Sequence, residues 1–147
     1  MAYHYTESGL DNVFLENGYT VHKTPYGEGV SIKDTAGLHK LIGRWLINLP
    51  KRLNGAELRF LRLEMDMTQR SLAAIIGQDE QAVRRWEKNR TRPINGSADL
   101  LLRALYAEYI DGNVKIRDAV NRLAGLDQIE HAEARLRESG DHWSMAA

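Results

Sequence analysis

Apolar residues between positions 34 and 50 recur with the period of an amphipathic helix. Asp34 is a typical N-cap, and Pro50 ends the run. The apolar positions fall on one stripe, which consists of Leu38, Leu41, Ile42, Trp45 and Leu46. The pattern predicts a helix over residues 35–47.

Four more helices are predicted after this one, and the first three are short. The segment Asn54-Gly55-Ala56-Glu57 has the form of a capping box, and Thr68 and Asp79 are typical N-caps for the next two helices. The fourth helix spans about residues 96–110. The apolar residues expected to face the core are Leu58, Leu61, Met65, Leu72, Ala73, Ile76, Val83 and Trp86. The apolar residues of the fourth helix are Leu100, Leu101, Ala104, Leu105 and Tyr109.

The first third of the chain is rich in β-prone runs and turn residues. Runs over 12–15 and 19–23 flank Asn17-Gly18, a pair typical of a type I′ hairpin turn. A third strand is expected over 30–32.

The last third of the chain has a weaker pattern. A helix is predicted over 116–123, and a charged helix or an irregular tail over 130–138.

Charge is distributed unevenly along a chain whose formal net charge is zero. Residues 51–93 contain ten Lys or Arg against six Asp or Glu, a net charge of +4, whereas both flanking segments are net acidic. Within this segment, residues 84–92 carry five basic side chains and a single acidic one, Glu87. Such a local basic patch is typical of a surface that meets phosphates, although a solvated helix face has the same composition.

The segment from Thr68 to Lys88 predicts a helix-turn-helix, two short helices joined by a turn at Gly77. Val83 and Trp86 are expected to hold the second helix on the core. Its outward face then consists of Glu80, Gln81, Arg84, Arg85 and Lys88. Gln suits the adenine edge in the major groove and Arg suits the guanine edge, so this face could read bases.

These residues resemble the Xre/Cro family of DNA-binding proteins. The shared pattern is Thr-Gln, Leu-Ala and Gly in 68–77, followed by Val-x-x-Trp-Glu in 83–87, and Arg92-Pro93 continues it. Asn89 stands where the family usually has Gly. Together with the helical and β-prone patterns, the resemblance predicts a mainly α fold, with a small N-terminal β-element and a five-helix helix-turn-helix domain. The expected division is 1–50 for the β-element and first helix, 51–111 for the DNA-binding domain, and 112–147 for a helical extension.

A narrower resemblance is to MqsA-type antitoxins, because residues 3–13 are similar to the start of their N-terminal zinc module. The four cysteine ligands of that module are absent here, so no zinc is expected. The base-reading residues of that family fall on Gln81 and Arg85.

The predicted DNA-binding site has two parts. Base reading is assigned to Gln81, Arg84 and Arg85. Phosphate contacts are assigned to the remaining polar and basic residues around the motif, namely Gln69, Arg70, Lys88, Arg90 and Arg92. Trp86 is interpreted as a core residue.

Several function classes are unlike this sequence. It has no Cys, no Gly-rich phosphate loop and no nucleophile paired with a base, and its five His lack ligand spacing. We therefore expect no enzyme, no cofactor and no metal. No run of 18 apolar residues occurs and the N-terminus lacks a signal peptide, which favours a cytoplasmic protein without a membrane partner.

Three functions remain open at this point. The first is a repressor of its own operon that binds a palindromic double-stranded DNA operator as a homodimer, with Leu101, Leu105 and Tyr109 in the expected dimer interface. The second is the antitoxin of a toxin–antitoxin pair, which would also bind a toxin protein. The third is a protein-interaction module with a vestigial motif, which the outward basic face disfavours.

Overall fold

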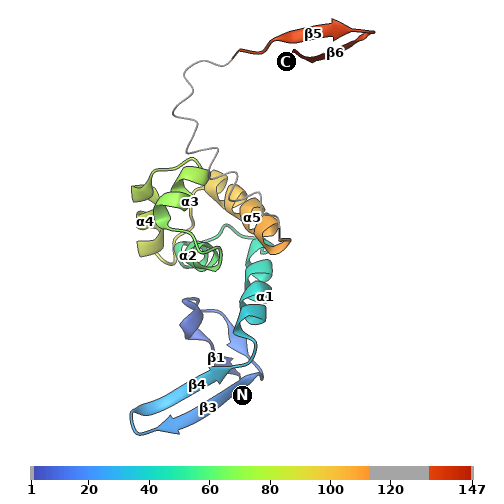
Figure 1. The fold of residues 1–147 in the computed structure, drawn as a ribbon. Helices are drawn as coiled ribbons and strands as arrows, with labels where there is room; N and C mark the ends of the chain where they lie inside the picture. The colour runs from blue at the N-terminus through green and yellow to red at the C-terminus, as the bar shows by residue number, and fades with distance from the viewer. Residues whose placement is uncertain (1, 113–132, 147) are drawn as a thin grey trace.

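The computed structural model describes residues 2–112 and 133–146. In these ranges it has five α-helices, one 3-10 helix over Thr6–Ser8, and three two-stranded antiparallel sheets (Figure 1). The helices are α1 (Thr35–Ile47), α2 (Gly55–Glu64), α3 (Gln69–Ile75), α4 (Glu80–Lys88) and α5 (Gly96–Ile110). The strands are β1 (Tyr3–His4), β2 (Phe14–Leu15), β3 (Tyr19–Thr24), β4 (Gly27–Ile32), β5 (Leu136–Ser139) and β6 (His142–Met145). The helical expectation is confirmed, and the fold is more mixed than the mainly α prediction because strands lie at both ends.

The predicted caps are confirmed, and they explain why the helices begin where they do. Asn54 and Glu57 form a reciprocal capping box: the Glu57 amide donates to Asn54 Oδ1, and the Asn54 amide donates to Glu57 Oε1, both at 2.9 Å. The Asp34, Thr68 and Asp79 side chains accept from backbone amides in the first turns of α1, α3 and α4. Each cap satisfies an amide that the helix itself leaves without an acceptor.

The core lies between the helices and also includes Tyr5, Leu10 and Leu15 of the N-terminal segment. The helix faces that it buries differ in part from those predicted. All the predicted core positions of α2 and α3 are buried. In α1, only Ile42 and Leu46 of the predicted stripe are buried, whereas Leu41 and Trp45 are exposed by 66% and 43%. The predicted stripe is wider than the surface that α1 buries, because α1 packs against α2 and α5 through only part of it.

Helix α5 buries mostly other residues than the apolar ones noted in the sequence. Its buried residues are Ala98, Asp99, Leu102, Leu105 and Tyr106. Leu100, Leu101, Ala104 and Tyr109 are exposed instead. Apolar residues surround most of this helix, so the 3.6-residue period could not identify the inner face.

The pairing predicted for the N-terminal strands was also wrong. Asn17-Gly18 does not join a hairpin: β2 pairs with β1, and β3 pairs with β4 from Tyr19↔Ile32 to Thr24↔Gly27. The hairpin turn is Pro25-Tyr26. The Thr24 hydroxyl closes it by donating to the Gly27 carbonyl at 2.7 Å. Pro25 favours a turn because its φ is fixed. The pairing of β3 with β4 over six residues also forms more hydrogen bonds between strands than a shorter hairpin across Gly18 would form.

The C-terminal residues form a β-hairpin, which differs from the prediction. Residues 136–138, expected in a helix or an irregular tail, belong to β5, which pairs with β6 from Leu136↔Met145 to Ser139↔His142. Gly140 and Asp141 both have positive φ, as a two-residue type I′ hairpin turn requires. The helix predicted over 116–123 lies outside the described residues.

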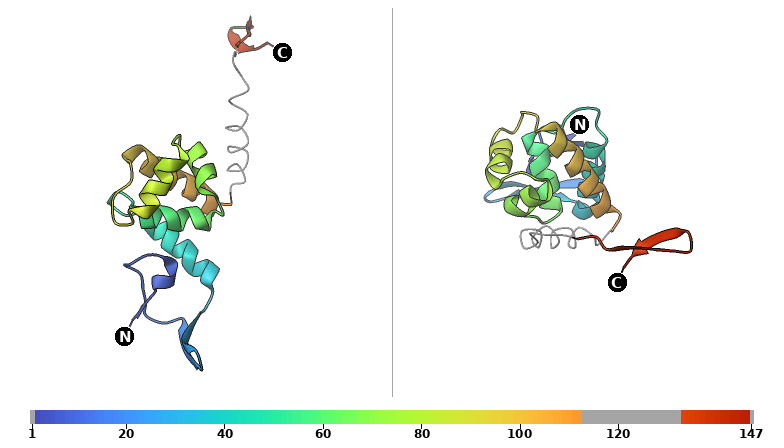
Figure 2. Two further views of the ribbon diagram at one scale, coloured as in Figure 1. Left: turned by 90° about the vertical axis from the view of Figure 1, so that its left-hand side faces the viewer. Right: turned by 90° about the horizontal axis from the view of Figure 1, so that it is seen from above.

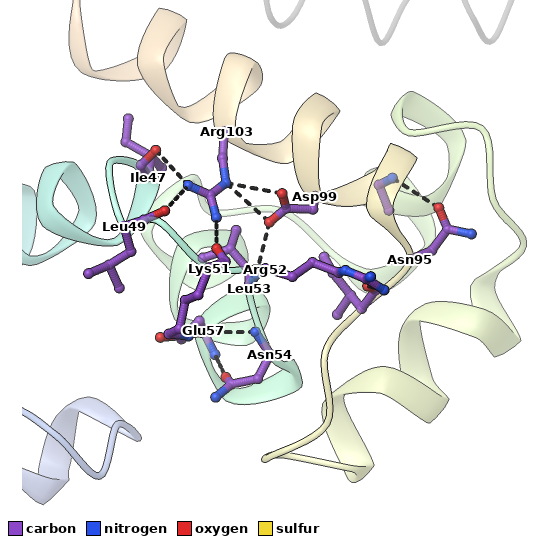
Figure 3. A network of polar contacts seen from close by, with 12 residues as sticks. Ile47, Leu49, Lys51, Arg52, Leu53, Asn54, Glu57, Asn95, Asp99 and Arg103 are labelled. Atoms are coloured by element: carbon purple, nitrogen blue, oxygen red, sulfur yellow. Dashed lines mark hydrogen bonds and ion pairs between the residues drawn. The ribbon is translucent and has the colours of Figure 1, made fainter.

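One arginine ties α1 and the linker after it to α5. Arg103 donates to the carbonyls of Ile47 and Leu49 at 3.0 and 2.8 Å and to that of Lys51 (Figure 3). Asp99 holds the guanidinium by an ion pair at 3.1 Å, and the same carboxylate accepts from the Leu53 amide at 2.9 Å. The linker carbonyls therefore have partners, and α1 leaves the helical core in a fixed direction.

A series of hydrogen bonds connects the N-terminal strands to the helices. Tyr5 Oη lies 2.7 Å from His39 Nε2 on α1, and His39 Nδ1 lies 2.9 Å from Glu64 Oε1 at the end of α2. A histidine with its proton on Nδ1 satisfies both contacts. In Figure 1 and in the left view of Figure 2, α1 accordingly joins the N-terminal strands to the cluster of α2–α5.

Candidate nucleic-acid interface

Helices α3 and α4 form the predicted helix-turn-helix. Gly77 adopts a φ of 70° in the turn between them, a left-handed conformation that favours glycine. Ala73 on α3 and Val83 on α4 are both buried, so the two helices pack through a small and a branched side chain. Trp86 is partly buried against the core, which agrees with its interpretation as a packing residue.

One face of α4 is polar, basic and exposed. Gln81, Arg84, Arg85 and Lys88 are all exposed on it. Arg84 pairs with Glu80 one turn earlier at 2.9 Å, whereas the side chains of Gln81, Arg85 and Lys88 make no hydrogen bond or ion pair with the described residues. The structure therefore brings together the three side chains predicted to read bases, and Gln81 and Arg85, four positions apart, share one face of the helix.

The residues predicted to contact phosphates differ in whether their side chains have partners inside the protein. Arg70 near the start of α3 and Arg92 after α4 are exposed. Arg90 instead contacts the N-terminal unit, the strand-rich segment over residues 2–32. There it donates to the Gly9 carbonyl at 2.6 Å and lies 3.4 Å from Asp11 Oδ1. Gln69 also has an internal partner: its amide donates to Glu87 Oε1 at 3.2 Å.

A buried ion pair beneath α4 was missed by the sequence analysis. Arg62 on α2 donates from Nε and Nη2 to both carboxylate oxygens of Glu87 on α4, at 2.6 and 2.8 Å. The two side chains are only 11% and 5% exposed. Arg62 also donates to the Met67 carbonyl at 2.9 Å, so the α2–α3 turn is joined to the same pair. The orientation of α4 thus depends on a charged contact as well as on apolar packing.

A signal for this pair was present in the sequence. Glu87 lies four residues after Val83, on the inward face of α4, and Arg62 lies four residues after Leu58 on the inward face of α2. A charge at an inward position needs a partner of opposite sign, because an unpaired buried charge is very costly.

Gly55, the first residue of α2, allows α4 to approach the start of α2 closely. A Cβ at this position would lie 1.7 Å from the Trp86 carbonyl oxygen, which is a backbone atom that cannot rotate away. The Gly55 amide donates to the Arg92 carbonyl at 3.2 Å, and the Ala56 amide to the Arg90 carbonyl at 3.1 Å. The end of α4 and the loop after it are therefore docked directly on α2.

We expect Gly55→Ala to destabilise the fold by about 1–3 kcal/mol, as overpacking against a fixed neighbour does. The matched control is Gly96→Ala, since Gly96 is also the first residue of its helix, and a Cβ there meets nothing within 4 Å. Urea unfolding of both variants measures the difference. A Gly55→Ala protein as stable as Gly96→Ala would contradict the close approach.

The described part of the chain was found to contain neither a cluster of metal-binding side chains nor a membrane-spanning helix. No group of three or more His, Cys, Asp or Glu in residues 2–112 and 133–146 is placed to hold a metal ion. None of the helices described is both long and apolar enough to span a bilayer.

Comparison with known proteins identifies the same region. A family model described as helix-turn-helix matches residues 58–105, from the middle of α2 into the second half of α5, and so includes all of α3 and α4. No curated protein and no solved structure matches the chain. The Xre/Cro-type motif is therefore confirmed at these residues, whereas the narrower likeness to MqsA-type antitoxins finds no support.

Proposed function

We propose that this chain, whose residues 58–105 carry a helix-turn-helix, is a sequence-specific double-stranded DNA-binding transcriptional regulator that represses its own operon. The observation that carries the proposal is the exposed face of α4. Gln81 and Arg85 have no side-chain partner in the described residues, although their helix is fixed from behind by Val83 and by the Arg62–Glu87 pair. A rigid helix that presents free Arg and Gln side chains is what major-groove reading requires.

The charges around α4 support a DNA partner over a protein partner. Arg70, Lys88 and Arg92 are exposed basic residues around the α3–α4 surface, where phosphates flank a helix in the major groove. Such contacts give affinity without sequence information and make it depend on salt. We assign these three residues to phosphate binding. Gln69 and Arg90 have partners inside the protein, so a contact with DNA would require them to rearrange or to share those partners.

The proposal includes a homodimer, because one short recognition helix buries too little surface for tight operator binding. The apolar side chains of Leu101 and Tyr109, exposed by 48% and 38% on α5, are candidates for the subunit contact. Leu105 is removed from the predicted interface, since it is buried in the core of its own protomer.

A toxin partner is left out of the proposal. The antitoxin prediction rests on residues 3–13, and these lie outside the matched family region. A small toxin-like gene beside this one would be the observation that restores it.

Footprinting on the DNA upstream of the gene tests the proposed function. We expect protection of two half-sites about one helical turn (~34 Å) apart, bound by one dimer. Random DNA of the same length serves as the control and should bind more weakly by a factor of about 10³ or more at physiological salt. Equal affinity for the two DNAs, or no binding to either, would contradict the proposal.

A further inference from the structure

A cavity of about 420 Å³ lies between the N-terminal unit and the helix-turn-helix domain. Residues 6–11 form one wall of the cavity, and α2 together with the end of α4 forms the other. Its polar lining comes from Thr6, Ser8, Asp11, Arg59, Glu87 and Arg90. The volume is in the range of small-ligand sites, and it lies directly behind the C-terminal end of α4.

Two guanidinium groups converge on this cavity from different elements. Arg90 donates to the Gly9 carbonyl at 2.6 Å. Arg59 Nη1 on α2 lies 3.9 Å from the point that a side chain on Gly9 would occupy. Both arginines therefore meet the same residue of the N-terminal unit, although they are about half exposed, at 54% and 51%.

The positive charge of this pair is incompletely balanced. Arg59 has Glu87 as its only ion-pair partner in the described residues, at 3.8 Å, and that carboxylate already accepts two bonds from Arg62 and one from Gln69. Asp11 is the other acidic residue of the lining, and it is 68% exposed and 3.4 Å from Arg90. Glu87 is thus neutralised by Arg62, and two arginines face one loosely held aspartate.

We propose that this cavity binds a phosphate group between Arg59 and Arg90. A guanidinium presents a fork of N–H donors that matches phosphate or carboxylate geometry. Two forks from separate elements need more acceptor oxygens than one carboxylate supplies, and a phosphate supplies them. The Thr6 hydroxyl, which also lines the cavity, is a further donor. The bound phosphate would replace the Asp11–Arg90 contact and join the N-terminal unit to the end of α4.

Two sources can supply this phosphate group. One is a small phosphorylated molecule free in solution, which would make the cavity an effector site. The other is the backbone of bound DNA, in which case the N-terminal unit completes the phosphate contacts of the loop after α4. Only the second source rests on the proposed function.

The first arm of the test titrates inorganic phosphate into the full chain, without DNA and at constant ionic strength, by isothermal calorimetry and amide NMR shifts. We expect saturable binding that weakens about tenfold or more in Arg59→Gln and in Arg90→Gln, because each loses charge-assisted hydrogen bonds. Arg44→Gln is the control, since Arg44 is exposed on α1 and its side chain makes no hydrogen bond or ion pair with the described residues. It should bind as the wild type does.

The second arm measures DNA affinity against salt concentration for the same proteins. If DNA supplies the phosphate, Arg59→Gln lowers the salt slope by about one per protomer and Arg44→Gln leaves it unchanged. The site is supported if phosphate binds more weakly to Arg59→Gln and Arg90→Gln than to Arg44→Gln. It is also supported if Arg59→Gln changes the salt slope as expected. The inference is overturned if phosphate binds equally to all variants or not at all and the slope stays constant. A wild type that fails to bind DNA refutes the proposed function alone, and the first arm then decides.

Discussion

Replacing Arg62 by methionine is expected to destabilise the protein by about 3–5 kcal/mol, because it leaves a buried carboxylate without its partner. Glu87 is 5% exposed, and Arg62 supplies its two shortest hydrogen bonds, at 2.6 and 2.8 Å. Gln69, at 3.2 Å, is neutral and cannot balance the charge. Urea unfolding followed by circular dichroism measures the loss of free energy.

The controls separate burial from charge. Arg59→Met removes an arginine that faces the same carboxylate from 3.8 Å but is 54% exposed, so it should cost less than about 1 kcal/mol. The double variant Arg62→Met, Glu87→Met should recover much of the stability lost in the single variant, since it removes the stranded charge. An Arg62→Met protein as stable as Arg59→Met would show that Glu87 is not buried as described.

Arg85→Ala is expected to weaken operator binding by about 1–3 kcal/mol per half-site, the value of one bidentate contact to a base. Arg85 is exposed and has no side-chain partner among the described residues, so the substitution should leave the stability of the fold unchanged. Gln81→Ala should act in the same direction and more weakly. Fluorescence anisotropy with a labelled operator measures both.

Arg44→Ala serves as the control here, because it removes the same charge from α1, away from α4. It should bind the operator about as well as the wild type. If Arg85→Ala and Arg44→Ala had the same affinity, Arg85 would be an ordinary surface charge.

The helix-turn-helix could be predicted from the sequence because its signals are local. Asn54, Thr68 and Asp79 each cap a helix within three residues of themselves, so no knowledge of the rest of the fold is needed. Gly77 marks the turn for an equally local reason, its positive φ.

The strand pairing could not be predicted in the same way. Asn17-Gly18 and Pro25-Tyr26 both favour turns, and the choice between them depends on which strands pair over their whole length. In the structure β3 pairs with β4 over six residues, whereas β2 has two residues and pairs with β1. At the C-terminus, the many charged residues over 130–138 favoured a helix or an irregular tail, so the turn at Gly140-Asp141 was not predicted.

Hydrophobic periodicity also could not predict the polar contacts that hold α4 and the loop after it in place. The inward charges of Arg62 and Glu87 each go against the apolar pattern, and only the packing of α2 on α4 shows that they meet. The position of Arg90 depends on residues 9–11, about 80 positions earlier in the chain. Contacts at that sequence separation leave no periodic signal.

One titration distinguishes base reading by α4 from phosphate binding by the residues around it. Wild type, Arg85→Ala and Arg92→Ala are each titrated against operator and random DNA at several salt concentrations. We predict that Arg85→Ala reduces the ratio of operator to random affinity. Arg92→Ala should weaken both DNAs equally and lower the salt slope by about one per protomer. An unchanged ratio in Arg85→Ala would contradict the account.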